Sequence, residues 1–457
     1  MPYQPLYLDI TGTLTAESPF HIGTGESWNP ATDNPLARRD GSQGGAFVLP
    51  GSSLRGVLRA HLRRECRLLG CSQEDVARLF GSASGTEGKQ GWLTILDAVA
   101  TTPESPRELR DHVRINRESG AAESKAKFDE EVGLSSTEFS FHCIYEGEED
   151  PACMRLLDGA VRALSEGRIR VGAGSGRGYG RIKLTEKSCR GFRRHDALDL
   201  QSFFSYRIDP KNVSPVAWPG HLDIQPASPL PDENGISTVT IGIRIECEGP
   251  VLVRSSVPPV DQASHADAAF FYSQKKKVLP GSSLRGICRS RAEKICLSAG
   301  WDVSRMEELF GSAKQDSSGR RGLLEFSDAE AISGQDVYLD HVAIDRITGF
   351  AAKGKKFAAI ALASPVFTGT ITVRYGPSSA GALTLWTLVL RDLIEGYRMW
   401  IGSGTTRGYG KIIRAAVTEI TGWRATLEGR KELKTEKSAT PGGFEITELI
   451  SVFGLNQ

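Results

Sequence analysis

The sequence predicts two tandem domains of one α+β class, and three observations support this prediction. The first is a set of motifs that recur in one order: LPGSSLRG begins at Leu49 and returns at Leu279, 230 residues later. LFGSA, DHV and RGYG return at the same offset to within one residue. The second is the period itself, which is far longer than a solenoid unit, so each copy is a whole domain. The third is a proline-rich segment between the copies.

That segment, residues 210–235, contains six prolines and few periodic apolar residues. Such a composition is typical of an extended, semi-rigid linker. We therefore expect a first domain at residues 1–209 and a second at residues 236–457, each long enough to bury a core of its own.

Each copy shows the same order of elements. An alternating strand pattern opens it, LYLDITGTLTA in the first copy and STVTIGIRIECEG in the second. PGSSLRG then begins a helix, with Ser52 or Ser53 as its N-cap in the first copy. A long segment starting at DHV, a strand, a second helix and a glycine-rich turn before a last strand follow. This order predicts a ferredoxin-like, RRM-type α+β sandwich.

The start of each PGSSLRG helix is a candidate phosphate site. Free N–H groups and the helix dipole favour an anion there, and arginines on the next turns can pair with phosphate. The alternative is a capped helix with surface arginines, but the repetition of the whole motif favours phosphate contact. The candidate residues are Ser52, Ser53, Arg55, Arg59, Ser282, Ser283, Arg285 and Arg289.

The two glycine-rich turns, VGAGSGRGYGRIKL and IGSGTTRGYGKIIR, are candidate RNA contacts. Glycine allows close approach of a ligand, Arg177 or Arg407 supplies charge, and a tyrosine can stack on a base. The tyrosines are Tyr179 and Tyr409. The alternative is a tight hairpin without a ligand. Neither turn fits GxGxxG, which argues against a dinucleotide site.

A zinc site is the less favoured interpretation of the cysteines. His61, Cys66 and Cys71 could begin one, but the second copy retains only Cys288 and Cys296. Packed core cysteines are therefore expected, and no metal is assigned to them. The eight cysteines form no CxxC pair, which fits a reducing compartment.

Composition places few limits on function. The formal net charge is +1, so any RNA-binding surface must be a local cluster of basic residues. No stretch reaches eighteen apolar residues, and the N-terminus lacks the features of a signal peptide. We therefore expect a cytoplasmic location without membrane association.

Taken together, the motifs resemble the RAMP superfamily, and most closely the backbone subunits of type III CRISPR effector complexes. LPGSSLRG, LFGS, the segment IDRITGFAAKGKKF from Ile344 and the RGYG turn carry the resemblance, which covers both halves of the chain. The DHVAIDRITG segment looks like the base of the family's β-hairpin thumb. Two such domains in one chain resemble the tandem-fused backbone subunit of type III-D-like systems.

The resemblance implies a fold and a function. Each domain would carry a long β-hairpin thumb, here residues 111–142 and 340–371, and would bind CRISPR guide RNA. The thumb would displace a base pair of the guide–target duplex, and an aspartate in the loop before PGSSLRG would cut the target RNA beside it. The products would carry 2′,3′-cyclic phosphate and 5′-OH ends. Other RAMP backbone subunits and a large polymerase-like subunit would be partners.

Asp33 occupies the position that this resemblance assigns to the cutting aspartate. Composition alone makes it a turn residue between Pro30 and Pro35. The second copy offers Asp261 or Asp267, of which we favour Asp267 because it precedes two alanines and an aromatic pair. A carboxylate of this kind can act as a general base or hold Mg²⁺ or another divalent cation shared with RNA phosphate.

Two other functions remain open at this point. One is a scaffold that holds guide RNA without cleaving the target. The other is a guide-precursor processing endoribonuclease, for which His61 on the PGSSLRG helix would be the candidate base.

Overall fold

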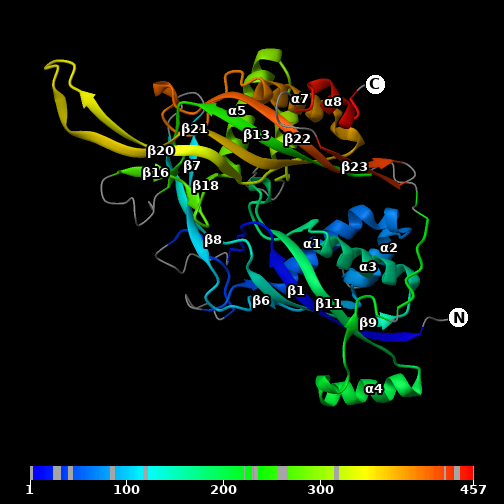
Figure 1. Cartoon of the computed structure of the whole chain (residues 1–457). Helices are drawn as coiled ribbons and strands as arrows, with labels where there is room; N and C mark the ends of the chain where they lie inside the picture. The colour runs from blue at the N-terminus through cyan, green and yellow to red at the C-terminus, as the bar shows by residue number, and fades with distance from the viewer. Residues whose placement is uncertain are drawn as a thin grey trace.

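The computed structural model describes residues 4–23, 32–39, 45–82, 88–116, 122–220, 222–228, 230, 235–255, 266–312, 319–426, 429–436 and 443–455. Over these ranges the chain forms two α+β domains of the same topology, joined through residues 210–235 (Figure 1).

The first domain is an antiparallel sheet with two helices on one face. Four strands lie in the order β11-β1-β9-β5. Counted along the β-α-β-β-α-β unit, this is the 4-1-3-2 order of the predicted ferredoxin-like sandwich. The elements are β1 (Pro5–Ala16), α1 (Gly51–Glu65), β5 (Leu93–Ile95), β9 (Glu138–Glu148), α3 (Pro151–Ser165) and β11 (Arg181–Arg193).

The second domain repeats this plan. Its strands lie in the order β22-β13-β21-β19, again 4-1-3-2 along the unit. The elements are β13 (Ser237–Glu248), α5 (Gly281–Ala299), β19 (Leu324–Phe326), β21 (Ala351–Tyr375), α7 (Ala380–Ile394) and β22 (Lys411–Thr426). The prediction of two copies of one fold is confirmed.

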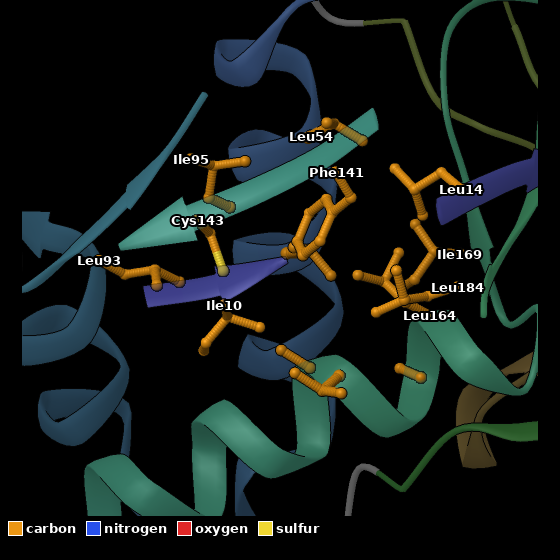
Figure 2. Close-up of a cluster of buried hydrophobic side chains, with 14 of the residues drawn as sticks. Ile10, Leu14, Leu54, Leu93, Ile95, Phe141, Cys143, Leu164, Ile169 and Leu184 are labelled. Atoms are coloured by element: carbon orange, nitrogen blue, oxygen red, sulfur yellow. The ribbon is translucent and has the colours of Figure 1, made fainter. Parts of the chain in front are cut away.

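Each domain has its own hydrophobic core between the helices and the sheet. Strand β1 is buried on both faces over Leu6–Ile10, and β13 alternates buried and half-buried residues along its length. Figure 2 shows the first core, in which Ile10, Phe141 and Leu184 from three strands meet Leu54 of α1 and Leu164 of α3. Burial of these faces is the main term that stabilises each sandwich.

Smaller elements complete the fold. The helices are α2 (Gln73–Phe80), α4 (Ala197–Ile208), α6 (Ser304–Phe310) and α8 (Ile446–Val452). The short strands are β2 (Val48–Leu49), β3 (Gly81–Ser82), β4 (Lys89–Gln90), β6 (Ala98–Val99), β10 (Ile169–Arg170), β12 (Val216–Ala217), β14 (Pro250–Val251), β15 (Arg254–Ser255), β16 (Ala268–Phe270), β17 (Tyr272–Ser273), β18 (Lys276–Leu279) and β23 (Gly429–Glu436). No helix of the described residues is long and apolar enough to cross a bilayer.

Both predicted thumbs are antiparallel hairpins. The first pairs β7 (Arg107–Ile115) with β8 (Ala122–Gly133), and the second pairs β20 (Ala329–Ile344) with β21. Because β21 continues into the central sheet, the second thumb projects from its domain as one long ribbon (Figure 1, yellow). The hairpins are confirmed, with strand bounds of 107–133 and 329–375 in place of 111–142 and 340–371.

The segment expected to be a linker packs on the first domain. Strand β12 pairs with β11, while Leu222 and Ile224 pack against the first core. The Leu230 N–H donates to the carbonyl oxygen of Arg67 at 2.7 Å. These described parts of residues 210–235 therefore follow the surface of the first domain.

The predicted serine N-cap at Ser52 or Ser53 is wrong. Helix α1 begins earlier, at Gly51, and neither serine caps it through a side chain. Instead the Gly51 N–H donates to Asp97 Oδ1 at 2.7 Å, and the first residue of α5 donates in the same way to Asp328 at 2.9 Å. Each helix start is thus capped by an aspartate that follows the second strand of the sandwich.

Candidate RNA interface and cleavage sites

The glycine-rich turn of the first copy docks on the second copy. The short 3₁₀ turn η3 (Ser175–Arg177) contacts both β19 and the start of α5. A Cβ at Gly178 would lie 2.5 Å from the carbonyl oxygen of Phe326, and a Cβ at Gly281 would lie 2.8 Å from that of Arg177. Glycine is therefore required on both sides of this contact.

Arg110, at the base of the first thumb, crosses the same contact and is only 2% exposed. Its Nε lies 2.6 Å from Glu108 Oε1, and its Nη1 lies 2.8 Å from Asp328 Oδ2 in the second copy. The guanidinium also stacks against Tyr179 and Phe271, each with a ring centroid 5.2 Å away. Thumb and helix cap are thus joined by one buried, fully partnered cation.

A small pocket opens beside this contact, between the first thumb and the start of α5. The polar residues that line it are Arg110, Asp111, His112, Arg254, Ser282 and Ser283, of which the two serines lie in the first turn of α5. A helix N-terminus combined with an exposed arginine is a favourable place for a phosphate. Of the predicted phosphate contacts, Ser282 and Ser283 are therefore the ones that the structure brings to a concave surface.

Asp33 lies against β8, the second strand of the first thumb, and is exposed to solvent. Its Oδ2 accepts the N–H of Asp129 at 3.0 Å, and its own N–H donates to Asp129 Oδ1 at 2.6 Å. The hydroxyl of Thr32 donates to the same Asp129 oxygen at 2.8 Å. These reciprocal bonds fix the loop carboxylate at the middle of β8, and Asp33 Oδ1 remains open among the described residues.

Asp267 occupies the corresponding position in the second copy. The Ala358 N–H donates to Asp267 Oδ2 at 2.7 Å, and the Asp267 N–H donates to the carbonyl oxygen of Ala358 at 2.9 Å. Ala358 follows Asp129 by 229 residues, which is the offset of the two DHV motifs. The two aspartates are therefore held alike by the second strand of each thumb. Asp261, the alternative candidate, lies outside the described residues.

The two sites differ in the carboxylates they offer to a cation. The first presents Asp33 and Asp129 side by side, whereas an alanine replaces the second carboxylate at Ala358. Hard divalent cations take six or more oxygen ligands, so either site would need oxygens from RNA phosphate and water. Within the described ranges no group of three or more metal-ligating side chains is present.

The arginines of the PGSSLRG helices have partners within the protein. An Nη2 of Arg55 donates to the carbonyl oxygen of Phe80, and Arg285 donates in the same way to that of Phe310. Arg59 Nη2 donates to the carbonyl oxygen of Gly81 at 3.0 Å. These bonds tie the helix to the LFGS turn, a structural role that repetition of the motif alone could not distinguish from phosphate binding. Phosphate contact by Arg55, Arg59, Arg285 and Arg289 stays a prediction.

The structure does not present Tyr179 and Tyr409 for stacking on bases, and their contact with RNA stays a prediction. Tyr179 is 2% exposed and Tyr409 is 8% exposed, so neither ring presents a face to a ligand. Tyr179 accepts a hydrogen bond from Arg110 at 3.2 Å, and Tyr409 Oη lies 2.8 Å from His341 Nε2. Burial raises the pKa of Tyr179 to about 12. Both tyrosines instead lock the glycine-rich turn to the base of its thumb.

Arg177 and Arg407 differ although their motifs are identical. Arg177 Nη2 lies 3.2 Å from Glu130 Oε1, and His112 Nε2 lies 3.0 Å from Oε2 of the same carboxylate. Burial opposes ionisation of Glu130, but the His112 hydrogen bond and the Arg177 charge together lower its pKa. Arg407 is exposed, stacks on Tyr409 and forms no ion pair within the described part of the chain. Arg407 is therefore the more available cation for RNA.

The cysteines and His61 are core residues. All eight cysteines are buried and free, and burial raises the pKa of Cys153 to about 12. His61 is 6% exposed and contacts Glu65 at 3.1 Å, and burial lowers its pKa. A buried imidazole of this kind is poorly placed to accept a proton from RNA, which argues against His61 as a processing base.

Two residues of the site escaped sequence reasoning. Asp129 stands in a charged run, AKFDEE, and Arg110 in RELRDHV, where neither is distinctive by composition. Alignment of the two thumbs by their strand registers supplies the signal, since Asp129 corresponds to Ala358 and Arg110 to Leu339. Both positions are found by looking for residues that differ between the two copies, and not by looking for residues that the copies share.

Comparison with known proteins gives two matches. The model of the RAMP superfamily matches residues 13–183 and 244–413, one region in each domain. The CRISPR system Cms endoribonuclease Csm3 of Methanocaldococcus jannaschii is 24% identical over 198 residues, which cover 39% of this chain and 78% of that protein.

Proposed function

The chain belongs to the RAMP superfamily, and on this premise we propose that it is a guide-RNA-binding backbone subunit of a type III CRISPR effector complex that cleaves base-paired target RNA. The same proposal takes other RAMP backbone subunits and a large polymerase-like subunit as its partners. The endoribonuclease name of the archaeal relative supports the cleavage activity.

The observation that carries the cleavage proposal is the equivalence of Asp33 and Asp267. Each is an exposed carboxylate on the loop before a PGSSLRG helix, and each accepts a main-chain N–H from the second thumb strand. A structural turn residue would need no such link to the thumb in both copies. The arrangement supports one cutting carboxylate beside each thumb.

Guide binding is proposed for the contact between the copies and the turn of the second copy. Arg254, Ser282 and Ser283 face the pocket there, while Arg407 is exposed on the other glycine-rich turn. Such groups recognise phosphate and RNA shape, so the sequence would be read by base pairing with the guide.

The thumbs are proposed to enter the guide–target duplex. The turn between β20 and β21 exposes two large apolar side chains, Ile347 at 96% and Phe350 at 78%. Asp345 stabilises this turn by accepting the N–H groups of Ile347 and Thr348 at 3.0 and 2.8 Å. An apolar tip on a long ribbon is suited to unstacking a base pair.

The chemistry follows from the position of the carboxylate. A displaced nucleotide frees its ribose 2′-OH to align with the adjacent phosphorus. Asp33 Oδ1 would take the 2′-OH proton as O2′ attacks phosphorus, and the 5′-oxygen would leave and gain a proton from solvent. The products are a 2′,3′-cyclic phosphate and a 5′-OH. Asp33 and Asp129 could hold a divalent cation, which would supply charge stabilisation at the phosphate.

The test maps cleavage of one labelled target RNA by the assembled complex. Asp33→Asn keeps an oxygen that can accept the Asp129 N–H but removes the base, so one cut should slow by about 10²- to 10⁴-fold with target binding unchanged. Asp267→Asn should slow a second cut, and Asp261→Asn should slow neither. Asp340→Asn, on the second thumb, is the matched control.

The outcomes separate the candidate functions. If both cuts persist at the wild-type rate in the Asp33→Asn/Asp267→Asn variant, the chain is a scaffold for guide RNA. If a 2′-deoxy nucleotide at the scissile position is cut as fast as a ribonucleotide, the proposed attack by the 2′-OH is wrong.

A further inference from the structure

One buried carboxylate on the contact between the copies holds three arginines. Glu325, on β19, has a side chain that is 3% exposed. Its Oε1 lies 2.5 Å from Nη2 of Arg321 and 2.5 Å from Nη2 of Arg374, both in the second copy. Its Oε2 lies 2.5 Å from Nε of Arg170, on β10 of the first copy. A single carboxylate balances the charge of one guanidinium, so this group carries a surplus of positive charge.

A fourth arginine adds to this surplus. Arg64, in the last turn of α1, is exposed and has no hydrogen-bonding partner among the described residues. Its charge acts on Arg374. Burial lowers the pKa of Arg374 to about 10, Glu325 opposes this shift, and the charges of Arg321, Arg170 and Arg64 add to it. Crowded positive charge therefore makes the charged form of Arg374 less favourable.

The neighbouring carboxylates already have arginine partners of their own. Oε2 of Glu65 lies 2.7 Å from Nη1 of Arg168. Oε2 of Glu17 lies 2.8 Å from Nε of Arg181, on β11. Among the described residues, Glu325 is then the carboxylate that remains for four guanidinium groups. We call these four residues the arginine cluster: Arg64, Arg170, Arg321 and Arg374.

The arginine cluster is separate from the residues proposed to bind guide RNA. The pocket at the start of α5 is lined by Arg110 and Arg254, and none of the four cluster arginines lines it. Arg64 lies near the C-terminal end of α1, about 20 Å along the helix from Gly51 at its start. A phosphate held by the cluster would therefore differ from one held at the start of either helix.

We propose that the arginine cluster is a phosphate site that bridges the two copies, with Arg64 on one side and Arg321 and Arg374 on the other. The planar guanidinium group matches the oxygens of a phosphate and can donate two hydrogen bonds to it. Because four cations face one carboxylate, a dianion offsets more of the surplus charge than the single charge of a phosphodiester does. The ligand class is therefore free phosphate or the phosphate monoester of a nucleotide.

Binding of this ligand stabilises the contact between the copies, because each copy contributes arginines to the site. The side chains of Arg321 and Arg374 keep 48% and 25% exposure, so a small anion can reach both from solvent. The inference does not depend on the proposed function.

The test is the Tm of the full-length chain with about 10 mM of each ligand, measured at constant ionic strength against sodium chloride. The ligands are sodium phosphate, adenosine monophosphate and dimethyl phosphate, of which the last represents the phosphodiester of RNA. The variants are Arg64→Gln and Arg321→Gln, whose side chains are exposed enough that folding should persist. Arg63→Gln, which removes an exposed arginine next to Arg64, is the matched control.

Phosphate should raise the Tm of the wild-type chain by about 3–6 °C, as expected for a dissociation constant of about 1 mM. Arg64→Gln and Arg321→Gln should each lose at least about half of this rise, and Arg63→Gln should keep it. A larger rise with adenosine monophosphate than with phosphate would assign the site to a nucleotide, and an equal rise would assign it to free phosphate.

Three outcomes would overturn the proposal. The first is no rise with phosphate or adenosine monophosphate, and the second is the same rise in Arg64→Gln and Arg321→Gln as in the wild-type chain. The third is an equal rise with dimethyl phosphate, which would make the cluster a contact for the backbone of RNA. No RNA takes part in these measurements, so their failure leaves the proposed ribonuclease untouched.

Discussion

Replacing Arg110 with leucine, the residue at the same place in the second thumb, should uncouple the two copies. Arg110 is 2% exposed and bridges Glu108 of its own strand to Asp328 of the other domain. Leucine can still cover the rings of Tyr179 and Phe271, so the packing loss is small. The main effect is that two carboxylates lose their shared cation.

The size of this effect follows from the exposure of the partners. Breaking a buried ion pair by removing one member costs roughly 3–5 kcal/mol. The side chains of Glu108 and Asp328 keep 16% and 18% exposure, so water can still reach both. The lower end of the range, about 3 kcal/mol, is therefore expected, which lowers Tm by about 6–12 °C for a unit of this size.

The assay is calorimetry of the full chain with two comparison variants. Arg114→Leu removes an arginine that is 73% exposed and should cost no more than about 0.5 kcal/mol. Adding Asp328→Asn to Arg110→Leu keeps the acceptor for the helix start but removes an orphaned charge, so it should recover part of the loss. If the Tm of Arg110→Leu lies within a degree or two of that of Arg114→Leu, the ion pairs of Arg110 with Glu108 and Asp328 make no net contribution to stability.

Three further predictions concern RNA binding and pH. Arg407→Glu should weaken guide-RNA binding and lower its salt dependence by about one phosphate contact. Arg177→Glu should chiefly lower Tm, because it breaks the ion pair with Glu130. Filter binding at several salt concentrations and melting curves of both variants check these results. Phe350→Ser should leave Tm within about 1 °C, since the ring is exposed, yet slow target cleavage or shift its position. Burial opposes ionisation of Asp9, but hydrogen bonds from neighbouring side chains outweigh it and lower its pKa. Its stabilisation is therefore full above the unfolded-state pKa of about 4 and is lost as pH falls through the lower folded-state value, so Asp9→Asn should flatten the decline of Tm below pH 4.

The repeat made the architecture predictable from sequence. Four motifs at one offset predicted two copies, and the order of strand and helix patterns predicted the ferredoxin-like topology. The thumbs followed from the resemblance, although their strand bounds differ by several residues. Periodicity and repeats are properties of the chain itself, so one sequence suffices to find them.

The parts that failed depend on contacts between distant residues. Ser52 and Ser53 are good N-caps by type, but the Gly51 N–H at the helix start is bound by Asp97, which lies 46 residues after Gly51. The composition of the turn around Tyr179 suggests a residue that stacks on a base, but Arg110 from the base of the thumb packs on its ring and the ring is buried. Loop length does not align Asp267 with Asp33, because the two loops differ in length; the common position is defined by the thumb strand that binds each carboxylate.

The path of residues 210–235 over the first domain has a consequence for assembly. Strand β12 adds to the first sheet and Leu222 and Ile224 pack on its core, so these described parts of the segment are fixed on the first domain. A tether of this kind holds the contacting surfaces of the two domains at an effective concentration of about a millimolar or more. The ion pairs, hydrogen bonds and glycine contact between the copies then form within one chain, which reduces the entropy lost on docking. Dilution, which takes apart assemblies of separate subunits, leaves this pair intact.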